Sequence, residues 1–144
     1  MTMTYLFKQK LNLSDLADFS RAGEKILVYE PDAYLADLYR HYLRVHNFDV
    51  KHCPDLARIS EQISEHRPKL VIFNTDSPGA WLKVKTMLSA LIAAFPGLRV
   101  VSTAYNINAQ GLSELMSLGV SSHINRRLSR PEDLVVIVKN ILNH

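Results

Sequence analysis

Four polar residues each stand where a short apolar run of the sequence ends, and together they could build a polar pocket. They are Glu30, Asn74, Thr103 and Arg126. The clearest run is Leu70–Phe73, which stops at Asn74 as a strand buried on both faces would. The carboxyl ends of parallel strands share one edge of a sheet, where ligand sites are built. These groups could close a hydrogen-bonded network. The spacing supplies no histidine and aspartate that would make Thr103 a nucleophile.

Strands and helices alternate regularly beyond residue 24. Helix starts are expected at Asp32, at Pro54 and at a Ser129–Glu132 capping box. The alternation predicts an α/β fold: a flavodoxin-like, doubly wound parallel sheet of five strands in the order 2-1-3-4-5. In that order Glu30 and Asn74 end neighbouring strands. The apolar runs place the five strands over 25–29, 48–52, 70–73, 98–102 and 121–125.

Residues 1–24 differ from the rest, so we expect an N-terminal arm over 1–24 and one domain over 25–144. Ser14–Ala22 could form a two-turn helix with Ser14 as its cap. The arm carries more apolar residues than a free tail usually does, which favours docking on its own domain or on a second copy. A frayed tail is the alternative.

The composition is that of a folded domain with an ordinary core, with 47% hydrophobic and 22% charged residues. No apolar run approaches the roughly 18 residues of a membrane span, and the first residues lack the pattern of a signal peptide, so we expect a cytoplasmic protein without membrane contact. The net charge is only +3, without a block of like charges. Direct nucleic-acid binding is therefore not expected.

The residue spacing predicts neither a metal nor a cofactor. Cys53 is the single cysteine, which excludes a disulfide within the chain and a cysteine-based zinc site. The six histidines include no pair at His-x-x-x-His spacing, and His41 and His46 are five apart. His123 is expected to be a half-buried strand histidine, and a role as a pH sensor is the alternative.

Four stretches follow one another at the ends of the expected strands: ILVYEPD at 26–32, P-x-L-V-I-F-x-x-x-x-P at 68–78, VVSTA at 100–104 and GVSSHINR at 119–126. In this order they resemble the receiver (CheY-like) domain of bacterial response regulators, over about residues 25–143. The resemblance implies a signalling domain. In this family acidic residues after the first strand hold Mg²⁺, an aspartate ending the third strand accepts a phosphoryl group, and a Thr or Ser and a Lys bind it.

The sequence departs from the family pattern at the positions that carry the chemistry. Asn74 occupies the acceptor position, and an amide is not a nucleophile for phosphoryl transfer. Pro31 replaces the second acidic residue, and Arg126 replaces the lysine. Arg127 stands where the family has a proline, so no cis bond is expected there. His123 stands at the aromatic switch position. The resemblance therefore implies a degenerate, or pseudo-receiver, pocket.

The remaining charges predict a static network without a metal. Glu30 is expected to face a neutral amide and the cation Arg126, so the net charge of the pocket is expected to be close to zero. A Glu30–Arg126 pair, or Asn74 bridging Glu30 and Thr103, could close it. Asp76 is expected to be a solvated loop carboxylate.

We expect a phosphorylation-independent signalling module that is not an enzyme and acts by contact with a protein partner, including a second copy in a possible homodimer. The resemblance places that contact on the face of the fourth helix, fifth strand and fifth helix. Two alternatives stay open: a receiver that uses a displaced carboxylate, Asp76 or Asp32, with Mg²⁺, and a ligand- or nucleic-acid-binding module with a basic surface. The expected face carries Met116, His123, Arg127 and Arg130.

Overall fold

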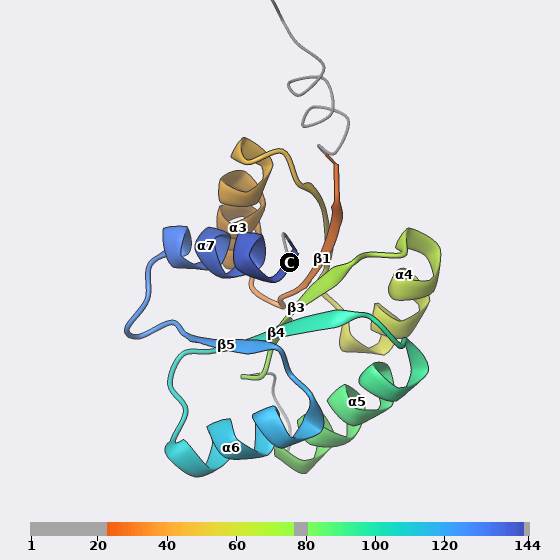
Figure 1. Ribbon diagram of the computed structural model, residues 1–144, viewed down its shortest axis with the longest axis vertical. Helices are drawn as coiled ribbons and strands as arrows, with labels where there is room; N and C mark the ends of the chain where they lie inside the picture. Colours follow the sequence, from red (N-terminus) through yellow and green to blue (C-terminus); the bar gives the residue numbers. More distant parts are fainter. Residues whose placement is uncertain (1–22, 77–80, 143–144) are drawn as a thin grey trace, which may run out of the picture.

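The computed structural model describes residues 23–76 and 81–142, which form one parallel sheet with helices on both faces (Figure 1). The strand order is β2-β1-β3-β4-β5, and each neighbouring pair is parallel. The predicted flavodoxin-like α/β class and strand order are therefore confirmed. Residues 1–22 of the expected arm lie outside the described residues. The strands are β1 (Lys25–Tyr29), β2 (Asp49–Cys53), β3 (Leu70–Asn74), β4 (Arg99–Ala104) and β5 (Ser122–Asn125).

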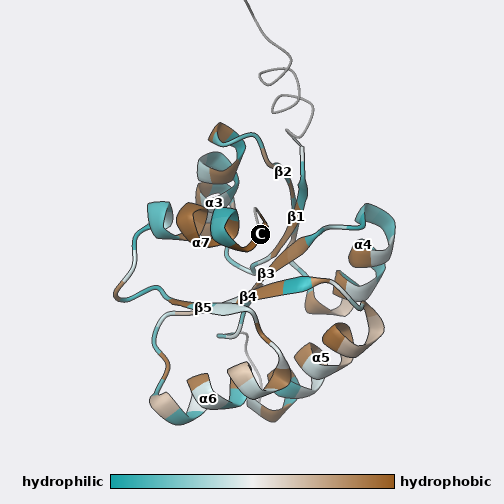
Figure 2. Cartoon of the chain, viewed as in Figure 1, coloured by the Kyte–Doolittle hydropathy of each residue, from teal (hydrophilic) through white to brown (hydrophobic). Residues whose placement is uncertain are grey.

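Each face of the sheet has its own apolar core, because successive residues of a strand point to opposite sides. Leu27 and Tyr29 pack in the core under α4, α5 and α6, whereas Ile26 and Val28 pack in the core under α3 and α7. Figure 2 shows the central strand β3 in hydrophobic colours, and all five of its residues are buried. The helices are α3 (Ala33–Val45), α4 (Ile59–His66), α5 (Trp81–Ala94), α6 (Ala109–Leu118) and α7 (Pro131–Leu142).

Most helix ends follow local signals in the sequence, and two expected starts are displaced. The Asp32 carboxylate accepts hydrogen bonds from the first turn of α3, so the predicted cap is confirmed. Pro54 does not begin a helix, because the Asp55 side chain caps a short 3₁₀ helix (η1, Leu56–Arg58) before α4. The Ser129–Glu132 capping box predicted for α7 is not the contact that begins this helix. Instead, the Asp133 carboxylate accepts the Arg130 backbone N–H at 2.8 Å, which is only one half of a capping box.

The register of the central strands brings the polar residues of the sequence to one edge of the sheet. Tyr29 pairs with Phe73, and Asn74 pairs with Thr103. Glu30 therefore emerges beside Asn74, and Arg126 follows the last residue of β5 on the far side of Thr103. This edge is the carboxyl end of all five parallel strands.

Candidate functional site

The centre of the pocket is a buried contact between an amide and a carboxylate. The Nδ2 group of Asn74 donates to both oxygens of the Glu30 carboxylate, at 2.8 and 2.7 Å. Glu30 is 1% exposed and Asn74 is 5% exposed. A buried carboxylate is costly unless its oxygens accept hydrogen bonds. Asn74 supplies that compensation without adding a second negative charge.

The other end of the Asn74 amide fixes its orientation. The backbone N–H of Asp76 donates to Asn74 Oδ1 at 2.6 Å. Nδ2 must therefore face Glu30, because the opposite rotamer would set an amide oxygen against the carboxylate and an NH₂ against an N–H. The same contact turns the chain just after β3. This residue needs a donor on one side and an acceptor on the other, and aspartate could not provide both while ionised.

The turn after β3 aims Asp76 across the edge of the sheet at Arg126. Asp76 Oδ2 accepts from Arg126 Nη2 at 2.8 Å and from the Tyr105 backbone N–H at 2.6 Å. The side chains of this ion pair are 17% exposed at Arg126 and 37% exposed at Asp76. Two predictions were therefore wrong: Asp76 is not a solvated loop carboxylate, and Arg126 pairs with Asp76 rather than with Glu30.

Thr103 lies between these partners but takes a smaller part in the network than expected. Arg126 Nη1 approaches Thr103 Oγ1 at 3.4 Å, which is a long contact for a hydrogen bond. The Thr75 hydroxyl donates to the Thr103 backbone oxygen at 2.8 Å. Asn74 thus bridges Glu30 and the Asp76 backbone, and the expected bridge from Glu30 to Thr103 is not formed.

The residues after β1 hold Glu30 from its other side. The Asp32 backbone N–H donates to Glu30 Oε2 at 3.1 Å, while the Asp32 carboxylate is occupied at the start of α3. Pro31 is exposed and has no side-chain ligand to offer. His52 Nε2 lies 2.7 Å from the Glu30 backbone oxygen and anchors this turn to β2. Glu30 therefore meets donors on both flanks.

The donor set does not fit the Mg²⁺ that the family resemblance implies. Mg²⁺ requires oxygen ligands in a near-octahedral arrangement and usually takes one or two carboxylates. Here the Glu30 oxygens accept from Asn74 and Asp32, and Asp76 is neutralised by the guanidinium of Arg126. Over residues 23–76 and 81–142, no three His, Cys, Asp or Glu side chains converge as metal ligands. We therefore derive no step through a metal.

The expected interaction face lies over α6, β5 and α7, and its residues differ in exposure. Met116 is 40% exposed, and Arg127 and Arg130 are exposed. His123 is half-buried, as predicted, with Nδ1 2.6 Å from the Ser102 hydroxyl. Burial lowers the pKa of His123 below its ordinary value, so this imidazole is neutral near pH 7.

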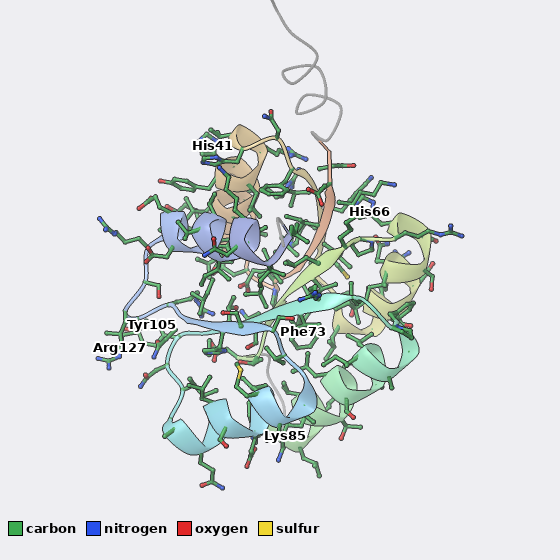
Figure 3. The ribbon with its side chains drawn as sticks, in the orientation of Figure 1. His41, His66, Phe73, Lys85, Tyr105 and Arg127 are labelled. Atoms are coloured by element: carbon green, nitrogen blue, oxygen red, sulfur yellow. The ribbon has the colours of Figure 1, made fainter. Side chains whose placement is uncertain are left out.

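Sequence reasoning missed the part that Tyr105 takes in the site. Its backbone N–H holds Asp76 and its carbonyl accepts from the Arg127 N–H at 2.9 Å, while its side chain is 60% exposed. Figure 3 shows Tyr105 and Arg127 close together at the same edge of the molecule. Backbone contacts of this kind leave no mark on residue type, so no sequence signal identified them.

No protein-family model matches the chain, and no curated protein does. None of the helices in the described part of the chain is long and apolar enough to cross a membrane.

Solved structures of receiver domains match most of the chain. A CheY-like response regulator receiver domain protein from Methanospirillum hungatei JF-1 is 16% identical with a TM-score of 0.75, covering 84% of this chain and 94% of that one. A response regulator from Thermotoga maritima is 13% identical with a TM-score of 0.76, covering 85% and 99%. The BeF3-activated receiver domain of Klebsiella pneumoniae RstA is 24% identical with a TM-score of 0.73, covering 83% and 99%. The chain thus has the flavodoxin-like fold of response regulator receiver domains.

Proposed function

We propose that this chain is a receiver-type signalling module that works without phosphorylation and without enzymatic activity, by contact with a protein partner. The receiver fold supports a signalling module. The observation that carries the rest is the buried Asn74–Glu30 contact, in which an amide occupies the end of β3 and donates to both carboxylate oxygens. This places a satisfied hydrogen-bond donor where phosphoryl transfer needs a nucleophilic carboxylate.

The charge arrangement of the pocket also opposes a phosphoryl group. Phosphoryl transfer relies on cations that neutralise the charge on the transferred oxygens. Among residues 23–76 and 81–142, the one cation of this pocket is Arg126, and it is engaged by Asp76 at 2.8 Å. A phosphoryl group near Asn74 would meet the buried negative charge of Glu30 without a free cation. These contacts support a pocket that keeps one arrangement.

Asp76 and Asp32 are poor substitutes for the missing acceptor. Asp76 is directed at Arg126 and at the Tyr105 N–H, and a phosphorylated Asp76 would lose both contacts. Asp32 accepts from Tyr34 and Leu35 at the start of α3, outside the buried pocket. The proposal therefore does not include a receiver with a displaced acceptor.

The exposed apolar side chains beside β5 support a protein partner. Leu112 and Met116 on α6 are 38% and 40% exposed, and Leu128 after β5 is 73% exposed. Arg127 and Arg130, in the segment between β5 and α7, are exposed too. Methionine and arginine are enriched in protein interfaces relative to the rest of the surface. The proposed partner is a signalling protein or a second copy of this chain.

Incubation with acetyl phosphate and Mg²⁺, followed by intact-mass measurement, tests the proposal. We expect no mass increase of a phosphoryl group. The receiver domain of Klebsiella pneumoniae RstA, whose structure was solved in a BeF3-activated form, is treated in parallel for comparison. A stoichiometric phosphoryl adduct on this chain would refute the proposal, and its absence from Asp76→Asn or Asp32→Asn would identify the residue that carries it.

The second-copy form of the partner is tested by molar mass in solution. If α6 and β5 form a dimer face, Met116→Glu should lower the mean molar mass at a fixed concentration, because it introduces a charge into an apolar contact. Leu82→Glu is the matched control, since Leu82 is 68% exposed on α5. A monomer at all concentrations would leave a different protein as the partner.

A further inference from the structure

A cavity of about 330 Å³ lies beside the polar pocket, between α3, β5 and the start of α7. Its size is within the range of small-molecule sites. Figure 1 shows α3 and α7 side by side on one face of the sheet, next to β5. The apolar part of the lining comes from Leu35 and Leu38 on α3, Ile124 on β5, and Pro131 and Leu134 on α7. This part could accept an apolar body.

The polar side chains that line the cavity can all donate hydrogen bonds. They are Tyr39, Tyr105, Arg126, Ser129 and Arg130, and the lining includes no carboxylate. Sites that bind small molecules commonly combine an apolar wall with a few convergent polar groups. A wall whose charged groups are both guanidinium groups selects for a ligand that accepts hydrogen bonds and carries negative charge.

Tyr39 is the most deeply buried of these polar groups, since the residue is 5% exposed. Within residues 23–76 and 81–142 its hydroxyl donates to no side chain or backbone oxygen. Burial raises its pKa to about 12, Arg126 lowers it, and the carboxylates of Glu30 and Asp76 raise it further, so the hydroxyl keeps its proton at neutral pH. This hydroxyl therefore offers an unused donor at the cavity wall.

The two arginines differ in how firmly they are already paired. Arg126 is held by Asp76 at 2.8 Å and so has a fixed position. Arg130 has its Nε 3.9 Å from Glu132, and both side chains are largely exposed. An exposed pair at that distance contributes little, so the Arg130 guanidinium is available to another anion.

We propose that this cavity binds a small apolar monocarboxylate, with its body among the side chains of α3, β5 and α7 and its carboxylate between the Tyr39 hydroxyl and the guanidinium of Arg130. A neutral molecule of the same shape would fill the apolar part but leave the donors unmatched. The inference goes beyond the proposed signalling function and does not depend on whether the chain is phosphorylated.

The position of the cavity provides an internal reporter of binding. Tyr105 lines the cavity and donates its backbone N–H to Asp76. Arg126 lines it too and holds the same carboxylate. A ligand against these side chains should therefore change the amide signal of Tyr105 as well as the signals of residues on α3 and α7.

The test is a titration of the full-length ¹⁵N-labelled chain with naphthoate, an apolar carboxylate, and with naphthylmethanol, its neutral counterpart. We expect saturable changes in the amide chemical shifts of Tyr105 and of four residues of the cavity wall: Leu38, Tyr39, Ile124 and Leu134. Naphthoate should bind about tenfold more tightly than the alcohol, because charge-assisted hydrogen bonds are markedly stronger than neutral ones. Equal affinities would overturn the assignment of a carboxylate ligand.

Paired variants separate the cavity from non-specific binding. Tyr39→Phe should weaken naphthoate binding several-fold, whereas Tyr34→Phe should not, since Tyr34 is 74% exposed on the same helix and does not line the cavity. Leu38→Trp should block the cavity, and Leu82→Trp, at a position of α5 that is 68% exposed, is its control. The proposal is wrong if the shifts spread over the whole surface, or if Leu38→Trp and Tyr39→Phe, both folded, bind naphthoate as the unmodified chain does.

Discussion

Replacement of Asn74 by aspartate tests whether the amide is a structural requirement of this pocket. Asn74→Asp removes the Nδ2 group that donates to both Glu30 oxygens at 2.8 and 2.7 Å and sets a second carboxylate against the first. Both residues are at least 95% buried, so solvent screens the repulsion poorly. A hydrogen bond to a charged group is worth about 1.5–3 kcal/mol, and the repulsion adds to its loss. We expect the free energy of unfolding to fall by about 3 kcal/mol at pH 7.

The loss of stability caused by Asn74→Asp should depend on pH in a defined direction. Two buried carboxylates in contact share a proton, so the pKa of the introduced carboxyl group is raised in the folded state above its unfolded value of about 3.9. A raised folded pKa favours the native state at low pH, and that advantage disappears as the pH rises. The destabilisation should therefore shrink from about 3 to about 1 kcal/mol between pH 7 and pH 5.

Urea unfolding of the variant and the parent chain at both pH values measures this effect. With a slope of about 1.5 kcal/mol per molar urea, the midpoint should fall by about 2 M at pH 7. Asn140→Asp is the matched control, since Asn140 is exposed on α7 and gains the same charge. A midpoint change at Asn74→Asp as small as that of the control, or one independent of pH, would refute the reasoning. Efficient phosphorylation of Asn74→Asp would contradict the inference that the pocket lacks a second acidic residue at Pro31 to support that chemistry.

Three further predictions concern the edge of the pocket. Asp76→Ala and Arg126→Ala should each destabilise, and the double variant should reveal a coupling of about 1 kcal/mol in urea unfolding, because the pair is only partly exposed; additive losses would contradict the pair. His123 should titrate by NMR with a midpoint below its ordinary 6.5, since burial lowers its pKa, and a midpoint at or above that value would contradict the burial. Asp32→Ala should cost about 1 kcal/mol by loss of the α3 cap, and Asp37→Ala, on the exposed side of α3, should cost much less.

The sheet could be predicted from the sequence because burial on both faces leaves a direct pattern in the residues. β1 was predicted over its observed residues, and β3 was identified by the apolar run that stops at Asn74. β2 lies one residue later than predicted, at Asp49–Cys53, because Phe48 packs at the edge of the core before the strand pairing begins. Residues that are apolar for packing and residues that are paired in a strand coincide only approximately.

The pocket could be predicted only in its membership. The sequence predicts that Glu30, Asn74, Thr103 and Arg126 lie at one edge of the sheet, and the structure has them there. Which of them pair was not predictable, because the turn after β3 depends on the Asn74 side chain accepting a backbone N–H. That contact redirects Asp76 toward Arg126 and leaves the Glu30 carboxylate to the amide alone on that side. Side-chain contacts with the backbone decide such choices, and residue spacing does not record them.

The central claim is that this pocket holds one arrangement instead of switching on a phosphoryl group. Amide spectra of the ¹⁵N-labelled chain, recorded with and without beryllofluoride and Mg²⁺, test it most directly at Asp76 and Tyr105, whose N–H groups belong to the network. The account predicts no saturable change at these amides under conditions that activate the Klebsiella RstA receiver domain. A saturable change there, with Mg²⁺ required, would contradict it.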